Sequence, residues 1–328
     1  MPNRMTCLPA RGTKTIAVAL AAFTAWSFAA LAAEPEMKAV RFIGNPSAGS
    51  AVVWLAKDKG YFADEGLDFQ MQRDFAAGLV TDSLLSGEAE VVWGGVTSML
   101  RVYSKGAPIA MIANADFDQT WEVLVQDDSP YKTIDDLKGK SIAVISPNTF
   151  CVLALQKAAK DRGWPKDSFN FTVLAPTDQV AAFGAKRIDG SCIWDPVRSQ
   201  IKEEFGGRSV WNNTEPPSNN VARSIGGGLV VNKDFVENNP NTVAAIQRAI
   251  ARATEEASRN PQIVYETLAR ATEQDLSKLE KMALPKYAVP PSMPAEIKAL
   301  ADAMHEYGLL SSPVDVSGFD LTEPPANN

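Results

Sequence analysis

Residues 40–60 read VRFIGNPSAGSAVVWLAKDKG, which predicts a strand, a turn and a helix in that order. Val40 to Ile43 forms the strand, and Gly44-Asn45-Pro46 ends it. Apolar residues then recur at helical spacing from Ser47 to Lys59, with serines near the start and Gly60 as the stop. A strand followed by a helix is the repeating unit of α/β folds, so this stretch indicates the fold class.

The same alternation continues along the rest of the chain. We predict further strands at Leu67–Met71, Val91–Trp93, Ile109–Ala113, Ser141–Ile145, Phe169–Leu174 and Ser191–Trp194. We predict further helices at Leu79–Leu85, Thr97–Ser104, Ile134–Leu137, Cys151–Arg162, Gln179–Lys186 and Val197–Phe205. Strands and helices that alternate in this way predict two parallel-rich sheets flanked by helices.

Two segments are expected to carry the chain between the two sheets. Trp121–Val125 leads out of the first unit, and the glycine-rich strand Ser224–Val231 leads back. Crossings near residues 124–132 and 215–230 predict a hinge of two crossing strands between two lobes. Lobe 1 would contain residues 34–125 and 226–328, and lobe 2 residues 126–225. After residue 231 only helices are predicted, and the tail from Ser311 is expected to be loose.

The composition is that of a packed soluble protein, because 45% of the 328 residues are apolar and 22% are charged. Acidic residues outnumber basic ones by 39 to 32, whereas nucleic-acid binding normally requires a basic excess. A single histidine, His305, and three cysteines, Cys7, Cys151 and Cys192, argue against histidine-rich zinc sites and Cys-x-x-Cys redox motifs. We therefore expect no nucleic-acid partner, no metal, no cofactor and no catalytic residues.

The first 33 residues have the pattern of a secretory signal peptide. Three positive residues precede an apolar run from Thr15 to Ala29, and Ala30-Leu31-Ala32 fits a cleavage site. The run is shorter than the roughly 20 residues that span a bilayer, although a single membrane anchor is the alternative. We expect a periplasmic mature protein. In that oxidising compartment Cys151 and Cys192 could form a disulfide or remain two buried thiols.

Three junctions between a strand and the next helix carry small polar residues. They are residues 44–50 with Asn45, Ser47 and Ser50, residues 94–98 with Gly95 and Thr97, and residues 146–150 with Asn148 and Thr149. In an open sheet ligands bind where such junctions converge, and free N–H groups at a helix N-terminus attract anions. These residues are therefore candidates for binding an anion. The alternative is that each junction is an ordinary helix N-cap.

Aromatic and acidic residues lie near the same strand ends. Three tryptophans could form a wall of the site: Trp93, Trp121 and Trp194. Three carboxylates could face a cationic group of the ligand: Asp118, Glu122 and Asp195. The alternatives are that the tryptophans are core residues and that Arg198 pairs internally with Asp195. His305 is expected to be structural.

An ordered set of motifs resembles a known family. Residues 56–67, AKDKGYFADEGL, resemble the A-K-x-x-G-Y-F-x-x-x-G-L signature of periplasmic solute-binding proteins for sulfonates, taurine, nitrate and related compounds. Residues 84–91, 103–109, 133–140 and 230–235 match further landmarks, so the resemblance covers residues 38 to 270. It implies a type II periplasmic-binding-protein fold that closes on a small-molecule ligand and docks on an ABC permease in the inner membrane. We expect a monomer without enzymatic activity.

Two departures from that family affect the choice of ligand. Thr149 stands where sulfonate and taurine binders often have a histidine, and Gly226-Gly227-Gly228 stands where taurine binders tend to have a carboxylate. An amine on the ligand would therefore need Asp195, or else Glu122 or Asp118, as its countercharge. We expect a taurine-like aminosulfonate or an alkanesulfonate, and the alternatives are nitrate, a pyrimidine or a choline-type cation.

Two other functions are compatible with the same fold. One is a metabolic enzyme, such as a pyrimidine-synthesising or menaquinone-pathway relative. Such an enzyme would need an activated His, Lys or Cys in its cleft, and the only histidine lies on a late predicted helix. The other is a sensory binding component that reports to a membrane receptor instead of a permease.

Overall fold

The computed structural model describes residue 1 and residues 33–73, 79–114, 116–118, 120–213, 225–288 and 293–322. The predicted signal peptide therefore lies outside the described residues, apart from Met1 and Ala33. No helix within the described ranges is long and apolar enough to cross a bilayer. Residues 34–328 form one unit, which contains the described helices and strands.

The first sheet has five strands in the order β2-β1-β3-β11-β4. They are β1 (Ala39–Gly44), β2 (Asp68–Arg73), β3 (Val91–Gly95), β4 (Ile109–Asn114) and β11 (Gly227–Asn232). β2 and β3 run parallel to β1, whereas β11 lies between β3 and β4 and is antiparallel to both. Four of the five strands therefore run in one direction and only β11 runs against them, so the sheet is mixed but parallel-rich, as predicted.

The second sheet also has five strands, in the order β10-β6-β9-β7-β8. They are β6 (Glu122–Val125), β7 (Ser141–Val144), β8 (Asn170–Val173), β9 (Gly190–Ile193) and β10 (Arg208–Asn212). β7 is parallel to β8 and β9, and β6 is antiparallel to β9 and β10. This sheet is mixed as well, and β10 is a strand that the sequence analysis missed.

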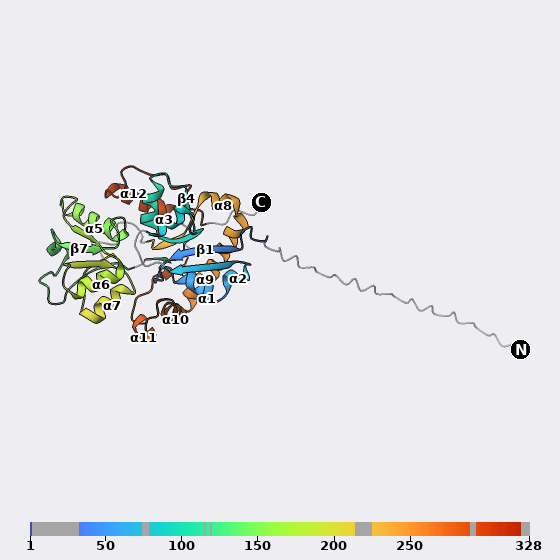
Figure 1. The fold of residues 1–328 in the computed structure, drawn as a ribbon, viewed down its shortest axis with the longest axis horizontal. Helices are drawn as coiled ribbons and strands as arrows, with labels where there is room; N and C mark the ends of the chain where they lie inside the picture. Colours follow the sequence, from blue (N-terminus) through green and yellow to red (C-terminus); the bar gives the residue numbers. More distant parts are fainter. Residues whose placement is uncertain are drawn as a thin grey trace. The chain divides into compact units, whose positions relative to one another are not determined.

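Helices flank both sheets, which confirms the predicted α/β class (Figure 1). With the first sheet go α1 (Ala51–Asp58), α2 (Tyr61–Asp64), α3 (Leu79–Ser86), α4 (Val96–Tyr103), α8 (Lys233–Asn238), α9 (Pro240–Arg259), α10 (Pro261–Thr272) and α11 (Leu276–Leu279). With the second sheet go the short 3₁₀ helix η1 (Ile134–Leu137) and the helices α5 (Phe150–Asp161), α6 (Pro176–Gly184) and α7 (Val197–Phe205). The last helix, α12 (Met293–Glu306), packs against α4.

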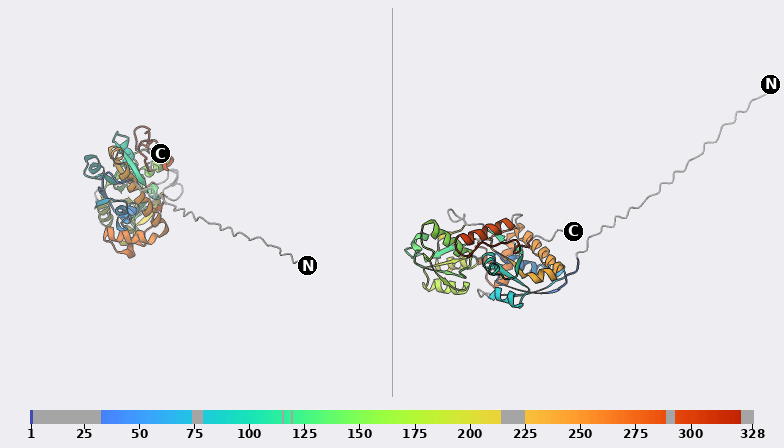
Figure 2. Two further views of the ribbon diagram at one scale, coloured as in Figure 1. Left: turned by 90° about the vertical axis from the view of Figure 1, so that its right-hand side faces the viewer. Right: turned by 90° about the horizontal axis from the view of Figure 1, so that it is seen from above.

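The apolar runs of the sequence account for the core. Every residue of β4 is buried, and so are residues 51–56 of α1, because α1 packs against α9 and α10. One buried cluster includes both sheets, with Val92 from β3, Ile142 from β7 and Leu300 from α12. The red helix α12 lies between the elements of the two sheets in the right-hand view of Figure 2. Glu306, the last residue of α12, forms an ion pair with Lys160 of α5 (3.1 Å).

The first crossing lies earlier in the chain than predicted. The short strand β5 (Asp116–Phe117) pairs antiparallel with β12 (Lys286–Tyr287), and the next strand, β6, already belongs to the second sheet. The chain therefore changes sheet before Glu122 and not at residues 124–132. The division into two lobes stays a prediction, with β6 moved into the second. The strand β12 also shows that the expectation of helices alone after residue 231 is wrong.

The tail from Ser311 is not loose as far as residue 322. The N–H of Met111 donates to the carbonyl of Phe319 (2.7 Å), and the N–H of Leu321 donates to the carbonyl of Met111 (2.8 Å). Phe319 is fully buried and packs against Tyr103, with ring centroids 5.3 Å apart. The tail therefore lies along β4, held by an aromatic residue that the sequence analysis did not weigh. Residues 323–328 lie outside the described ranges.

Candidate ligand-binding site

The junction between β1 and α1 is organised by two buried serines. The Ser50 hydroxyl donates to the carbonyl of Asn45 (2.6 Å), and the N–H of Ser47 donates to the Ser50 hydroxyl (2.9 Å). These bonds hold residues 45–50 in a turn, so α1 begins at Ala51, four residues later than predicted. The N–H of Val53 already donates to the carbonyl of Ser50 (2.9 Å), so the earlier N–H groups of the first turn are the donors that an anion could use.

The junction between β3 and α4 lies beside the second crossing and the second sheet. Gly95 precedes α4 in an extended conformation, and Thr97 is buried in its first turn. The N–H of Val96 donates to the carbonyl of Gly226 (3.3 Å). The Ser98 hydroxyl donates to the carbonyl of Asn148 (3.5 Å), which belongs to the junction after β7. Two of the predicted junctions, one from each sheet, are therefore in contact.

The third junction connects β7 to α5. Thr149 is the N-cap of α5, and its hydroxyl accepts the N–H of Val152 (3.5 Å), as the N-cap alternative predicted. Asn148 differs, because its Oδ1 is buried and has no hydrogen-bond partner among the described residues. A buried polar atom of that kind is costly unless a ligand or water satisfies it, so Asn148 is the stronger candidate for contact with a ligand.

Two of the three tryptophans pair with each other. The rings of Trp121 and Trp194 have centroids 4.8 Å apart and an interplanar angle of 54°. The Trp121 backbone N–H donates to Asn213 Oδ1 (2.6 Å), whereas its indole Nε1 is buried and meets no acceptor in the part of the chain that the structure describes. Trp93 covers β11 instead, since a Cβ at Gly227 would lie 2.6 Å from its Nε1. Trp121 therefore offers an indole N–H donor, and Trp93 has a packing role.

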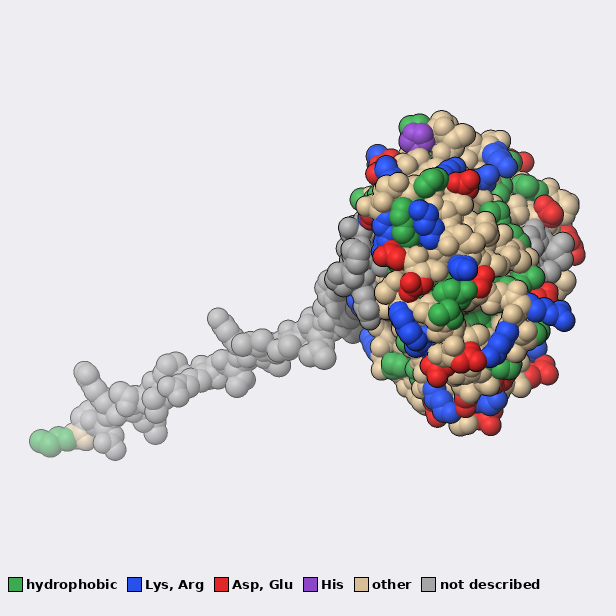
Figure 3. All heavy atoms as spheres, turned by 90° about the vertical axis from the view of Figure 1, so that its left-hand side faces the viewer, with side chains coloured by type: hydrophobic (Ala, Val, Ile, Leu, Met, Phe, Trp, Pro, Cys, Tyr) green, Lys and Arg blue, Asp and Glu red, His purple; other side chains and the backbone are tan. Residues whose placement is uncertain are grey.

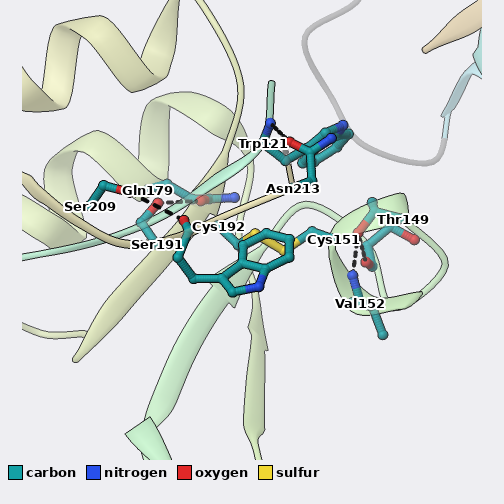
Figure 4. Close-up of a disulfide and its surroundings, with 11 residues drawn as sticks. Trp121, Thr149, Cys151, Val152, Gln179, Ser191, Cys192, Ser209 and Asn213 are labelled. Atoms are coloured by element: carbon teal, nitrogen blue, oxygen red, sulfur yellow. Dashed lines mark hydrogen bonds between the residues drawn. A yellow bond between two sulfur atoms is a disulfide. The ribbon is translucent and has the colours of Figure 1, made fainter. Parts of the chain in front are cut away.

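A disulfide connects two segments that carry predicted site residues. It joins Cys151, in the first turn of α5, to Cys192 in β9, with the two Cα atoms 6.4 Å apart (Figure 4). Of the two alternatives left open by the sequence, the pair of buried free thiols is wrong. The bond ties the segment of Asn148 and Thr149 to the segment that continues into Trp194.

Each of the three carboxylates proposed as a countercharge has a partner within the chain. Arg198 lies between Glu122, at 2.9 Å, and Asp195, and the Asp195 carboxylate also accepts the N–H (3.0 Å) and the hydroxyl (2.6 Å) of Ser199. Lys202 approaches the second oxygen of Glu122 at 2.6 Å. The remaining candidate, Asp118, pairs with Lys286 of β12 (2.9 Å). Buried carboxylates require such partners, so these contacts favour the internal pairing that was the alternative for Asp195.

Sequence reasoning did not single out Asp116, the first residue of β5. Its carboxylate is fully buried, and among the described residues only the N–H of Gly227 donates to it, at 3.3 Å to Oδ1. Burial raises the pKa of Asp116 to about 7, and the bond from Gly227 opposes part of that rise. Its neighbour across the strand pair is Tyr287, whose hydroxyl donates to the carbonyl of Ala48 (2.5 Å).

The charged side chains on the side seen in Figure 3 include both signs. Basic and acidic side chains are interspersed on that face, without a large region of one sign. His305 is exposed on α12 and approaches the carbonyl of Leu310 at 3.4 Å. Its place on the surface is consistent with the expectation that it takes no part in the site.

The sequence matches the NMT1/THI5-like family over residues 47–263, more than half of the chain. The chain belongs to the NMT1/THI5-like family. A protein of Brucella abortus that is named provisionally as a binding protein is 25% identical over 290 residues, 84% of this chain and 87% of that one. The taurine-binding periplasmic protein of Escherichia coli is 25% identical over 208 residues, 63% of this chain and 62% of that one.

Solved structures agree with the NMT1/THI5-like assignment at the level of the fold. The alkanesulfonate-binding protein from Xanthomonas axonopodis pv. citri bound to MOPS superposes with a TM-score of 0.73, at 19% identity. The match covers 87% of this chain and 98% of that one, and it identifies the type II periplasmic-binding-protein fold. The NMT1/THI5-like chain is therefore a binding protein and not an enzyme.

Proposed function

We propose that the protein captures a small sulfonate in the periplasm, with a taurine-like aminosulfonate as the first choice, and delivers it to an ABC permease. The observation that carries this proposal is the contact between Ser98 of α4 and the carbonyl of Asn148, because it brings helix starts from the two sheets together. Relatives that bind taurine and alkanesulfonates support the same class of solute.

The chemistry of the converging junctions suits a sulfonate. Such a group spreads one negative charge over three oxygens, so it can accept hydrogen bonds from several directions. The N–H groups of Val96 and Val152 already have acceptors, so the other first-turn N–H groups of α4 and α5 would supply donors. The indole Nε1 of Trp121 and the Thr97 hydroxyl would add two more. Enclosure of the solute would lower the local dielectric constant and strengthen each of these interactions relative to water.

A ligand panel tests the proposal directly. The exported protein would be mixed with taurine, alkanesulfonates, nitrate, choline-type cations and pyrimidines, and its thermal unfolding measured with each. A solute present at 100 times its Kd adds about 2.7 kcal/mol to the free energy of unfolding, which gives a clear shift. We expect the sulfonates to produce that shift. Stabilisation by a pyrimidine or a choline-type cation alone would contradict the proposal.

A further inference from the structure

Asp116 lies between the β1–α1 junction and the second crossing. A Cβ at Gly49 would lie 2.8 Å from Asp116 Oδ2, and a Cβ at Gly226 would clash with the same oxygen. Glycine is therefore needed at both positions for the carboxylate to fit. The carbonyl of Gly226 in turn accepts the N–H of Val96 at the start of α4. The carboxylate is thus placed where two of the predicted anion-binding junctions come together.

The negative charge of Asp116 is not balanced within the described chain. Oδ2 is buried and has no hydrogen-bond partner there, and no Lys or Arg of the described residues pairs with either oxygen. Tyr287 lies opposite Asp116 in β12, but its hydroxyl donates to the carbonyl of Ala48 and not to Asp116. Lys286, the next residue of β12, pairs with Asp118. A buried carboxylate left in this state is costly, and a ligand that brings its own N–H donors and a positive charge would remove that cost.

We propose that the Asp116 carboxylate binds the protonated amine of the solute and so makes this protein prefer an aminosulfonate to an alkanesulfonate. This inference rests on the sulfonate-binding function proposed above. The sulfonate would accept hydrogen bonds from the helix-start donors, and the amine would donate to the unpartnered Oδ2 of Asp116. Asp195, Glu122 and Asp118 need not supply the countercharge, because each already has a cation within the chain.

The closing experiment uses taurine and ethanesulfonate, which differ only in the amine. Titration calorimetry on the wild-type protein and on Asp116→Asn gives the affinity for each solute. We expect Asp116→Asn to lower the affinity for taurine by about 10- to 100-fold, the range expected for the loss of a hydrogen bond to a charged group. The affinity for ethanesulfonate should change by less than about threefold. Asp189→Asn is the control, since that carboxylate binds Tyr131 and Ser141 and should leave the taurine-to-ethanesulfonate ratio unchanged.

A pH series on the wild-type protein tests the same idea without a substitution. Amine binding requires ionised Asp116, whose pKa is raised to about 7, so taurine affinity should fall about tenfold per unit as the pH drops below 7. Tyr287 faces Asp116 from the paired strand and stays protonated in that range. Burial, followed by the charge of Asp116, raises the pKa of Tyr287 well above its ordinary value, and Lys286 stays with Asp118. Ethanesulfonate affinity should stay level.

The outcomes separate the two proposals. Equal losses of both solutes in Asp116→Asn, or equal pH profiles, would overturn the role of Asp116 and leave sulfonate binding intact. Loss of taurine preference in Asp195→Asn, with Asp116→Asn unchanged, would overturn it as well. If the wild-type protein binds neither solute, the sulfonate function fails and the inference fails with it.

Discussion

Thr97 is the clearest single side chain with which to test the anion site. It is buried at the start of α4, next to the contact between Ser98 and Asn148. Thr97→Val removes the hydroxyl and keeps the shape. We expect sulfonate affinity, measured by calorimetry, to fall tenfold or more, because a hydrogen bond to a charged group contributes about 1.5–3 kcal/mol.

Thr254→Val is the matched control for that substitution. Thr254 is 4% exposed, as Thr97 is, but its hydroxyl donates to the carbonyl of Ile250 within α9 (2.8 Å). The control should leave the affinity unchanged. A Thr97→Val protein that binds sulfonate as well as the control would show that the hydroxyl is not a ligand contact.

Arg198 is the residue on which the stability of the buried charges depends. Arg198→Met would leave Asp195 and Glu122 without the guanidinium that lies between them, although Lys202 would still reach Glu122. Removal of one partner from a buried ion pair lowers the free energy of unfolding by about 3–5 kcal/mol. Chemical denaturation measures the change. Lys202→Met, at a half-exposed lysine, should lower the free energy of unfolding by less than about 1 kcal/mol. Equal effects of the two substitutions would contradict the conclusion that stability depends on Arg198.

The site residues that could be predicted are those whose role depends on near neighbours in the chain. Thr149 caps the helix that follows it, and Asp195 pairs with Arg198 three residues later, so both contacts follow from local spacing. Asp116 could not be found in this way, because its surroundings come from Gly49, Gly226 and β12. The run of three glycines at 226–228 was the available signal, since it marks a strand against which other groups pack closely.

At the scale of elements, local sequence signals predict where a helix or strand begins and ends better than they predict the direction in which a strand runs. The bounds of α7 were predicted correctly, and the helix ends at Gly206 in the left-handed conformation. The start of α1 was predicted too early because Ser47 and Ser50 bond within the preceding turn. Periodicity identified β6 and β11 as strands but carries no information on their direction. For that reason the antiparallel pairs of both sheets were missed.

The disulfide is the element-scale feature with the largest expected effect on stability. It closes a loop whose ends are 41 residues apart. The entropy of such a loop predicts that Cys151→Ser with Cys192→Ser lowers the free energy of unfolding by about 4 kcal/mol. Urea denaturation under oxidising conditions measures this loss. Wild-type protein treated with a reductant should resemble the double variant, and a reductant without any effect would argue that the thiols are free.

At the scale of the whole molecule, α7, which flanks the second sheet, contacts α11, which lies with the helices of the first sheet. A cavity of about 220 Å³ lies between them, lined by Ser199 and Leu279 among others. Exposed ion pairs cross the same contact, with Lys281 at 2.8 Å from Glu203 and Lys278 at 3.8 Å from Glu204. If the two sheets approach each other around a solute, these pairs would favour the closed form.

Lys281→Glu tests that contribution. The new carboxylate would repel Glu203, and because exposed pairs contribute about 0.2–1 kcal/mol we expect solute affinity to fall about two- to fivefold. The loss should shrink at high salt, which screens exposed charges. Lys298→Glu is the control, since Lys298 is similarly exposed but pairs with Asp302 inside α12. Equal affinities of the two variants at low salt would contradict a role in closure.

The pairing of the tail with Met111 also affects how copies of the protein behave toward one another. β4 is the last strand of its sheet, and residues 319–321 occupy the backbone groups of Met111 that a foreign strand could otherwise use. The tail therefore keeps another copy of the protein from pairing with β4 at Met111. A chain shortened before Phe319 would expose the apolar side chains that Phe319 covers, such as Tyr103, and the backbone groups of Met111 at the edge of β4.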